Sequence, residues 1–235
     1  MLSILTASFI PFIIIMTLII VHELGHFLMA LLLKVEVKKI YLYPLGGISK
    51  FFLPLNASYK KEFLILIAGP IFQQIAKTLL IIILPKEEQL IELYHYGILI
   101  FNLLPIYPLD GGKLMHMFIS QITSYKISLY ISIFISYLVI IIILFLNIKN
   151  LKLNIIVMII FLIIKVYSEQ NKINYIYEKF ILERYLNNYK FKNSKIITNN
   201  KSFYKNKSHI IKDNNKYYLE KEYLIKKYQK NLKKR

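Results

Sequence analysis

The sequence predicts an all-α polytopic membrane protein with five to six transmembrane helices, a short β-hairpin insert and a small basic cytosolic tail. The chain of 235 residues is 56% hydrophobic and has a mean hydropathy of +0.48, which is too apolar for an ordinary soluble domain. A bilayer-spanning helix needs roughly 20 predominantly apolar residues. Five stretches come close to this length or exceed it, namely 2–33, 63–84, 93–120, 127–147 and the shorter 151–167.

The first stretch, 2–33, would form a helix of about 48 Å, longer than a ~30 Å hydrocarbon core. We expect Pro11 to divide it into a short leading segment and a helix over about 12–33. No secretory signal peptide is expected, because no basic region precedes the run and the run is too long. The lysine-rich connection 34–61 is predicted on the inside and the acidic connection 85–92 on the outside, which places the C-terminus in the cytoplasm.

Positive charge is concentrated near the C-terminus. Of the formal net charge of +18, residues 168–235 contribute +12. On a membrane protein, the positive-inside rule and attraction to anionic lipid explain such a tail, so we expect anionic lipid as a partner and no nucleic acid. We therefore divide the chain into a transmembrane domain, 1–167, and a basic cytosolic tail or small module, 168–235. Cysteine is absent, which excludes disulfides and thiolate metal sites.

The first apolar stretch contains the sequence HELGH. His22, Glu23 and His26 are its only ionisable side chains. A charged residue at membrane depth costs about 2.5–3.5 kcal/mol or more, which indicates a function or a compensating partner. Histidines four apart on a helix can bind one metal ion, and Glu23 is then within reach of a water at the metal. The alternative is a polar cluster that stabilises helix packing, which Ser or Asn would serve at lower cost.

A catalytic zinc ion takes three protein ligands, so two histidines leave one to be found. Asp110 follows a segment in which Pro105 and Pro108 interrupt the apolar run. Non-helical backbone at membrane depth persists only when it is buried in protein or lines a wet cavity. We therefore predict Asp110 as the third ligand, with helix capping as a compatible role. His95, expected in an outer loop, and His116, expected to be a packed histidine, are the weaker candidates.

Other polar and glycine-containing segments suggest supporting roles. Asn102 can hydrogen-bond a substrate carbonyl or a developing oxyanion, and an interhelical hydrogen bond is an equal alternative. The segment YPLGGISKF, with Gly46 and Gly47 at its turn, predicts a short hairpin or strand whose edge accepts an extended substrate. Gly69–Pro70 predicts a kink or a close-packing point inside the second span. Gln73 and Gln74 are polar at membrane depth and can face the site, although a packing role is the favoured prediction.

The order of these motifs resembles the site-2 protease family of intramembrane zinc metalloproteases. HELGH in a span is followed by a Gly-Gly segment, then AGP, then NLLPIYPLDGG, and the likeness covers about residues 12–120. AGPIFQ, together with FILERYLNN after the last span, resembles the stage IV sporulation protein FB subgroup. Such proteins usually have six spans, so the resemblance implies that the first helix here is truncated or merged.

The resemblance also implies roles for individual residues. Glu23 would be the general base, His22, His26 and Asp110 the zinc ligands, and Asn102 a residue that positions the substrate strand. The substrate would be a membrane-associated regulatory protein, in this subgroup a pro-sigma factor processed during sporulation, with inhibitory membrane proteins as further partners. The alternative function is a non-proteolytic zinc-binding membrane scaffold or transporter, which would not need the glutamate.

The C-terminal tail departs from the subgroup, whose members often end in a nucleotide-sensing CBS domain. Only about fifty residues follow ILERY, too few for a CBS pair. The sequence SHIIKDNNKYYLEKEYLIKKY predicts a hairpin that turns at Asp213–Asn215, followed by a short amphipathic helix.

Overall fold

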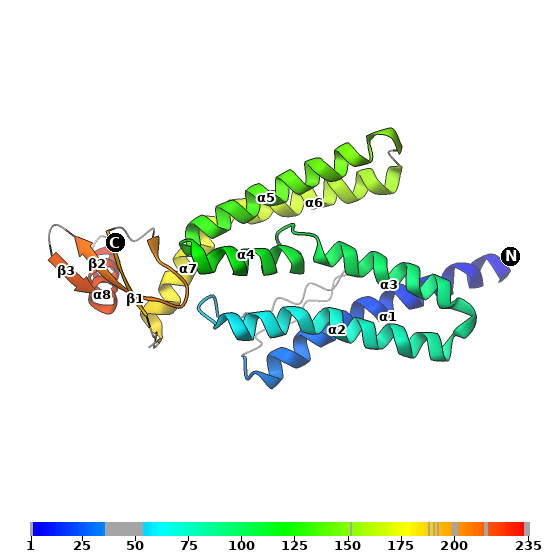
Figure 1. The fold of residues 1–235 in the computed structure, drawn as a ribbon, viewed down its shortest axis with the longest axis horizontal. Coiled ribbons are helices and arrows are strands. Elements are labelled where there is room, and N and C mark those ends of the chain that lie inside the picture. The colour runs from blue at the N-terminus through cyan, green and yellow to red at the C-terminus, as the bar shows by residue number, and fades with distance from the viewer. Residues whose placement is uncertain are drawn as a thin grey trace. The chain divides into compact units, whose positions relative to one another are not determined.

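The structure is a computed structural model that describes residues 2–35, 54–150, 152–187, 189, 191, 193–198, 202–213 and 216–232. Over these residues it contains eight α-helices and one three-stranded sheet (Figure 1). The chain divides into two compact units. Unit 1 comprises Met1–Leu53 and Tyr59–Leu104, and unit 2 comprises Pro54–Ser58 and Pro105–Arg235. The predicted hairpin at Gly46 and Gly47 lies outside the described residues.

Unit 1 is built from three helices, α1 (Leu2–Leu32), α2 (Tyr59–Ile83) and α3 (Glu88–Leu103). Its core joins all three helices through the buried apolar side chains of Ile14, Leu18, Ala76, Leu80 and Ile91. The helix α1 continues through Pro11, so the predicted break there is wrong. Membrane helices tolerate an internal proline because local adjustments satisfy the freed backbone groups.

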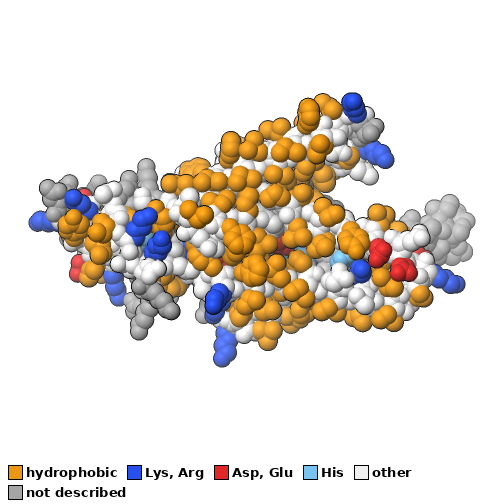
Figure 2. All heavy atoms as spheres, viewed as in Figure 1, with side chains coloured by type: hydrophobic (Ala, Val, Ile, Leu, Met, Phe, Trp, Pro, Cys, Tyr) orange, Lys and Arg blue, Asp and Glu red, His pale blue; other side chains and the backbone are white. Residues whose placement is uncertain are grey.

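Among the residues that the structure describes, four helices are long and apolar enough to cross a membrane, and the chain is an integral membrane protein. They are Phe9–Leu32, Tyr59–Ile83, Tyr125–Asn147 and Leu153–Asn171. Large apolar side chains cover much of the visible surface of the long helices, as expected for helices that face lipid (Figure 2). The interruption predicted at Pro105 and Pro108 is confirmed, because this segment separates α3 from α4, and the apolar stretch 93–120 is therefore not a single span.

Unit 2 contains four consecutive helices, α4 (Asp110–Ile122), α5 (Tyr125–Leu146), α6 (Leu153–Asn171) and α7 (Ile173–Leu186). The helices α5 and α6 run side by side (Figure 1). One face of α5 carries three fully buried serines, Ser128, Ser132 and Ser136. At the start of α5, Tyr125 stacks on Phe180 of α7 with 4.1 Å between ring centroids. Small residues along one helix face allow close packing of neighbouring helices.

The tail folds into a small sheet and a helix. The strands β1 (Ser194–Ile197) and β2 (Ser208–Asp213) are parallel, and β3 (Lys216–Leu219) is antiparallel to β2. The helix α8 (Glu220–Leu232) follows β3 directly. The predicted tail hairpin and helix are therefore confirmed. The parallel strand β1 was not predicted, so the fold is mostly helical rather than all-α.

A buried arginine connects the parts of unit 2. Arg184 of α7 donates hydrogen bonds to the Glu220 carboxylate, to Asn56 Oδ1 at 3.1 Å and to the Lys207 carbonyl. Its guanidinium also lies 4.3 Å from the ring centroid of Phe191. Through these hydrogen bonds, Arg184 connects the turn Pro54–Ser58, which lies between α1 and α2 in the chain, to α7 and to the tail.

Candidate metal centre

His22 and His26 lie one turn apart on α1 and are 2% and 5% exposed. Both imidazoles are oriented by α2. The Nδ1 of His26 lies 2.7 Å from the carbonyl oxygen of Ile65, and the Nδ1 of His22 lies 2.9 Å from Gln73 Oε1. Metal-ligating histidines usually donate their other ring N–H to such an acceptor, which fixes the tautomer. The geometry is therefore that of two prepared imidazole ligands.

The hydrogen-bond partners on α2 determine which nitrogen of each imidazole carries the proton. The Ile65 carbonyl only accepts, so His26 donates from Nδ1. Gln73 Nε2 donates to the His95 carbonyl at 3.0 Å, so its Oε1 accepts and His22 also donates from Nδ1. Each neutral ring then keeps a lone pair on Nε2.

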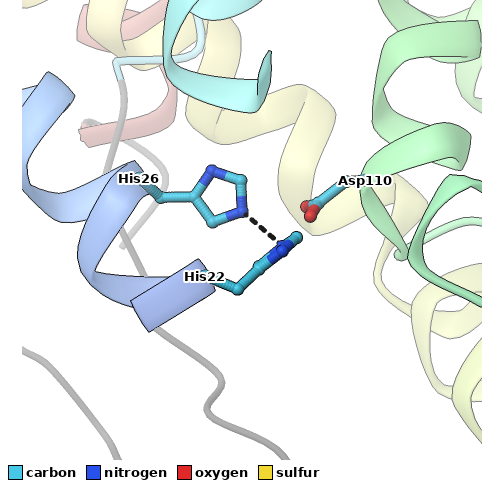
Figure 3. A group of neighbouring side chains, drawn as sticks. All are labelled: His22, His26 and Asp110. Atoms are coloured by element: carbon cyan, nitrogen blue, oxygen red, sulfur yellow. Dashed lines mark hydrogen bonds between the residues drawn. The ribbon is translucent and has the colours of Figure 1, made fainter. Parts of the chain in front are cut away.

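These two Nε2 atoms face each other at 3.1 Å, and the ring planes are nearly perpendicular (Figure 3). The contact drawn as a dashed line in Figure 3 depends on the tautomers of the two rings. With both Nδ1 atoms donating to α2, both Nε2 lone pairs are available to a cation. A tetrahedral zinc ion with ~2.0–2.1 Å bonds separates two ligand nitrogens by about 3.3 Å. The spacing of the histidine pair therefore fits this metal.

Gly69 of α2 makes room for the histidine pair. A Cβ at this position would overlap the imidazole of His26 and would lie 2.8 Å from Nε2 of His22. The close-packing role predicted for Gly69–Pro70 is therefore confirmed. The glycine of the AGP motif therefore leaves space for the two imidazoles beside α2. The side chain of any larger residue would occupy this space.

Asp110 belongs to unit 2, where it is the first residue of α4 and 7% exposed. Leu109 occupies the N-cap position, so Asp110 does not cap the helix. Lys113 Nζ lies 3.0 Å from the Asp110 carboxylate, and a carboxylate in the first turn is favoured by the helix dipole. A Cβ at Gly112 would overlap the backbone of Ile106, so the second glycine of DGG lets the preceding segment fold back over α4.

The remaining predicted residues are placed as follows. Glu23 follows His22 on α1 and is half-buried, and Asn102 lies near the end of α3 and is also half-buried. The roles of Glu23 as base and Asn102 as a substrate contact stay predictions. Gly46 and Gly47 lie outside the described residues.

The two weaker ligand candidates are accounted for by packing. His116 is buried between the rings of Tyr107 and Tyr125, and its Nε2 lies 3.0 Å from Ser128 Oγ. The prediction that His95 lies in an outer loop is wrong. His95 is fully buried within α3 beside Gln73. The signal was present in the sequence, because the apolar stretch 93–120 already contains position 95.

Gln73 makes a more specific contact than the packing role that the sequence favoured. Its side chain is fully buried and joins His22 to His95. The signal was present, because Gln73 lies four residues after Gly69 and so falls on the same face of α2. Its packing role is real, but it also fixes the tautomer of a candidate ligand.

Comparisons with known proteins agree with this site. The model of peptidase family M50 matches residues 10–92 and 88–146, more than half of the chain. Stage IV sporulation protein FB of Bacillus subtilis (strain 168) is 31% identical over 194 residues, which cover 78% of this chain and 67% of that protein. A zinc metalloprotease of Methanocaldococcus jannaschii is 31% identical over 119 residues, 47% of this chain and 34% of the archaeal protein.

A solved structure gives the same result. The site-2 protease from Methanocaldococcus jannaschii superposes with a TM-score of 0.55 at 26% identity, covering 67% of this chain and 76% of that chain. The histidine pair and its supporting helix lie inside the matched residues. The chain belongs to peptidase family M50 and is an intramembrane zinc metalloprotease of the site-2 protease type.

Proposed function

We propose that zinc is held by His22, His26 and Asp110, the three side chains drawn in Figure 3, and that Glu23 is the general base. The observation that carries this proposal is the histidine pair, whose Nε2 lone pairs converge because Ile65 and Gln73 hold both Nδ1 protons. Asp110 adds a buried carboxylate, which supplies the oxygen ligand and one negative charge.

Each residue has a defined task in peptide hydrolysis. When bound, zinc supplies a Lewis acid that makes a water molecule reactive near neutral pH. Glu23 takes a proton from the attacking water and delivers it to the leaving amine. Asn102 donates a hydrogen bond to the substrate backbone, and Gly46 and Gly47 are assigned to substrate positioning.

The proposed substrate is a membrane-associated pro-sigma factor cleaved during sporulation, supported by the likeness to the sporulation protein. Inhibitory membrane proteins are proposed as further partners. We place the protein in the cell membrane, with residues 1–167 as the protease domain and 168–235 as a cytoplasmic module. The net charge of +12 on this module favours contact with anionic lipid.

Co-expression with candidate membrane-tethered pro-sigma factors tests the function. The wild-type chain should release a shortened product. Glu23→Gln should abolish release and keep its zinc, since the amide has nearly the same shape but does not accept the proton. Full turnover by Glu23→Gln would contradict the assignment of the base. Absence of product from every membrane-tethered pro-sigma factor would contradict the substrate class.

A further inference from the structure

The segment Pro105–Leu109 precedes Asp110 and is not helical. Backbone N–H groups in such a segment need acceptors, because none is supplied by lipid. The two prolines lack an N–H group, and the Leu109 N–H donates to the Ile106 carbonyl at 2.8 Å. The N–H of Tyr107 instead donates to a side chain of another helix, Ser136 Oγ of α5, at 2.8 Å.

Ser136 is well suited to accept this bond. Its side chain is fully buried, and its hydroxyl donates to the Ser132 carbonyl one turn earlier at 2.7 Å. The hydroxyl hydrogen is therefore used within α5, and the oxygen lone pairs are directed to Tyr107. A donor and an acceptor on one small side chain satisfy both helix and segment without widening the gap between them.

The segment is held from its other side by α4. Gly112 leaves no Cβ where the backbone of Ile106 passes. The backbone at 106–107 is thus fixed between Gly112 and Ser136, and Asp110 follows after three residues. Anything that loosens the Tyr107 bond lets the start of α4 shift.

We propose that Ser136 is a positioning residue of the zinc site, which holds Tyr107 and so fixes the backbone that presents Asp110. This inference rests on the proposed function, because it needs Asp110 as a ligand. The other buried serines of the same face have different partners. Ser128 bonds to His116, whereas in the described residues the Ser132 hydroxyl donates only to its own helix, at 2.8 Å.

Ser132 therefore provides a matched control. Ser136→Ala should lower zinc affinity about 10- to 100-fold, the range for lost support of a metal ligand. Ser132→Ala removes the same hydroxyl from the same face and should stay within about threefold of wild type. Affinity is measured on the full-length protein by competition with a zinc chelator. Equal affinities of the two variants would overturn the inference.

A second pair separates the hydroxyl from packing. Ser136→Thr and Ser136→Val have the same shape, but only threonine accepts the Tyr107 N–H. Threonine should bind zinc more tightly, and in the zinc-free protein amide exchange at Tyr107 should be faster with valine. Indistinguishable threonine and valine variants would overturn the inference even if Ser136→Ala does not fold.

Asp110→Ala in the same assay distinguishes a failure of the proposed ligand set from a failure of the role proposed for Ser136. If Asp110→Ala loses affinity and Ser136→Ala does not, the Ser136 inference fails and the ligand set stands. If Asp110→Ala keeps its affinity, the ligand set fails and the Ser136 inference fails with it.

Discussion

Two of the buried polar clusters in the described part of the chain use opposite chemistry. The histidine cluster of unit 1 consists of His22, His26, Gln73 and His95, and the arginine cluster of unit 2 consists of Arg184, Asn56, His209 and Glu220. The first is assembled from imidazoles and an amide within membrane-type helices. The second centres on a full positive charge and a carboxylate in the tail module. Substitutions in the two clusters should therefore have different consequences for the protein.

Location explains the difference. Unpaired charge is far more costly at membrane depth than neutral hydrogen-bonded groups, so the histidine cluster orients ligands through single neutral bonds. Three members of the arginine cluster, Arg184, His209 and Glu220, follow the last candidate span in the chain, and Arg184 makes charged hydrogen bonds to Glu220. Breaking the arginine cluster should affect folding, whereas breaking the histidine cluster should affect zinc affinity.

The largest expected effect is on the arginine cluster. Arg184→Met leaves the Glu220 carboxylate without its guanidinium partner and should destabilise the module by about 3–5 kcal/mol. Amide exchange in β2 and α8 measures this loss. Lys227→Met is the control, because Lys227 pairs with the exposed Glu178 and such a pair contributes only about 0–1 kcal/mol. Similar exchange in the two variants would contradict the central role of Arg184.

The next effect is on the histidine cluster. Gln73→Leu keeps the volume but removes the acceptor for Nδ1 of His22, so zinc affinity should fall about 10- to 100-fold with little change in unfolding. Gln74→Leu, at the exposed neighbouring position, should leave zinc affinity unchanged. A loss of folding in Gln73→Leu without a loss of zinc affinity would indicate a packing role alone.

The smallest effect is the pH dependence of the arginine cluster. Burial lowers the pKa of His209, and this outweighs the hydrogen bond with Glu220 that raises it. The neutral ring fits its partners, since the Tyr204 N–H donates to its Nε2 at 2.9 Å and its Nδ1 lies 2.8 Å from Glu220. Protonation of Nε2 would remove the acceptor that Tyr204 uses.

The sign follows from linkage. Unfolded histidine binds a proton near pH 6.5, whereas the folded module resists it, so stability falls as the pH drops through this value. Burial alone would raise the pKa of Glu220, but the hydrogen bonds from His209 and Arg184 together hold it below its usual range, which adds a further loss near pH 4.5. Thermal unfolding between pH 7.5 and 5.5 measures the loss of stability that comes from His209. The His209→Asn variant should lose less stability over this range, and a pH profile equal to that of the wild type would contradict the role of His209.

The sequence predicted what depends on local pattern. HELGH predicted the histidine pair, Gly69–Pro70 predicted close packing, and Asp213–Asn215 predicted the tail hairpin. These predictions were possible because helix periodicity and turn residues are local signals. The prolines at 105 and 108 likewise predicted the division of 93–120. Continuity through Pro11 depends on how neighbouring groups satisfy that particular backbone, so it required the structure.

Long-range partners were not predictable from pattern. Arg184 meets Asn56, 128 positions away, and Tyr107 meets Ser136, 29 positions away. No periodicity indicates such pairs, because each partner is also a reasonable surface or packing residue by itself. The contact of Ser136 with the segment before Asp110 therefore could not be predicted from the sequence, whereas the candidate ligands could.

The zinc affinity of Asp110→Ala, compared with those of His26→Ala and Glu23→Gln, tests the ligand set most directly. The account predicts that Asp110→Ala and His26→Ala both lose more than the roughly 100-fold upper range for an indirect support, and that Glu23→Gln binds zinc like the wild type. Wild-type zinc affinity in Asp110→Ala would contradict the central claim.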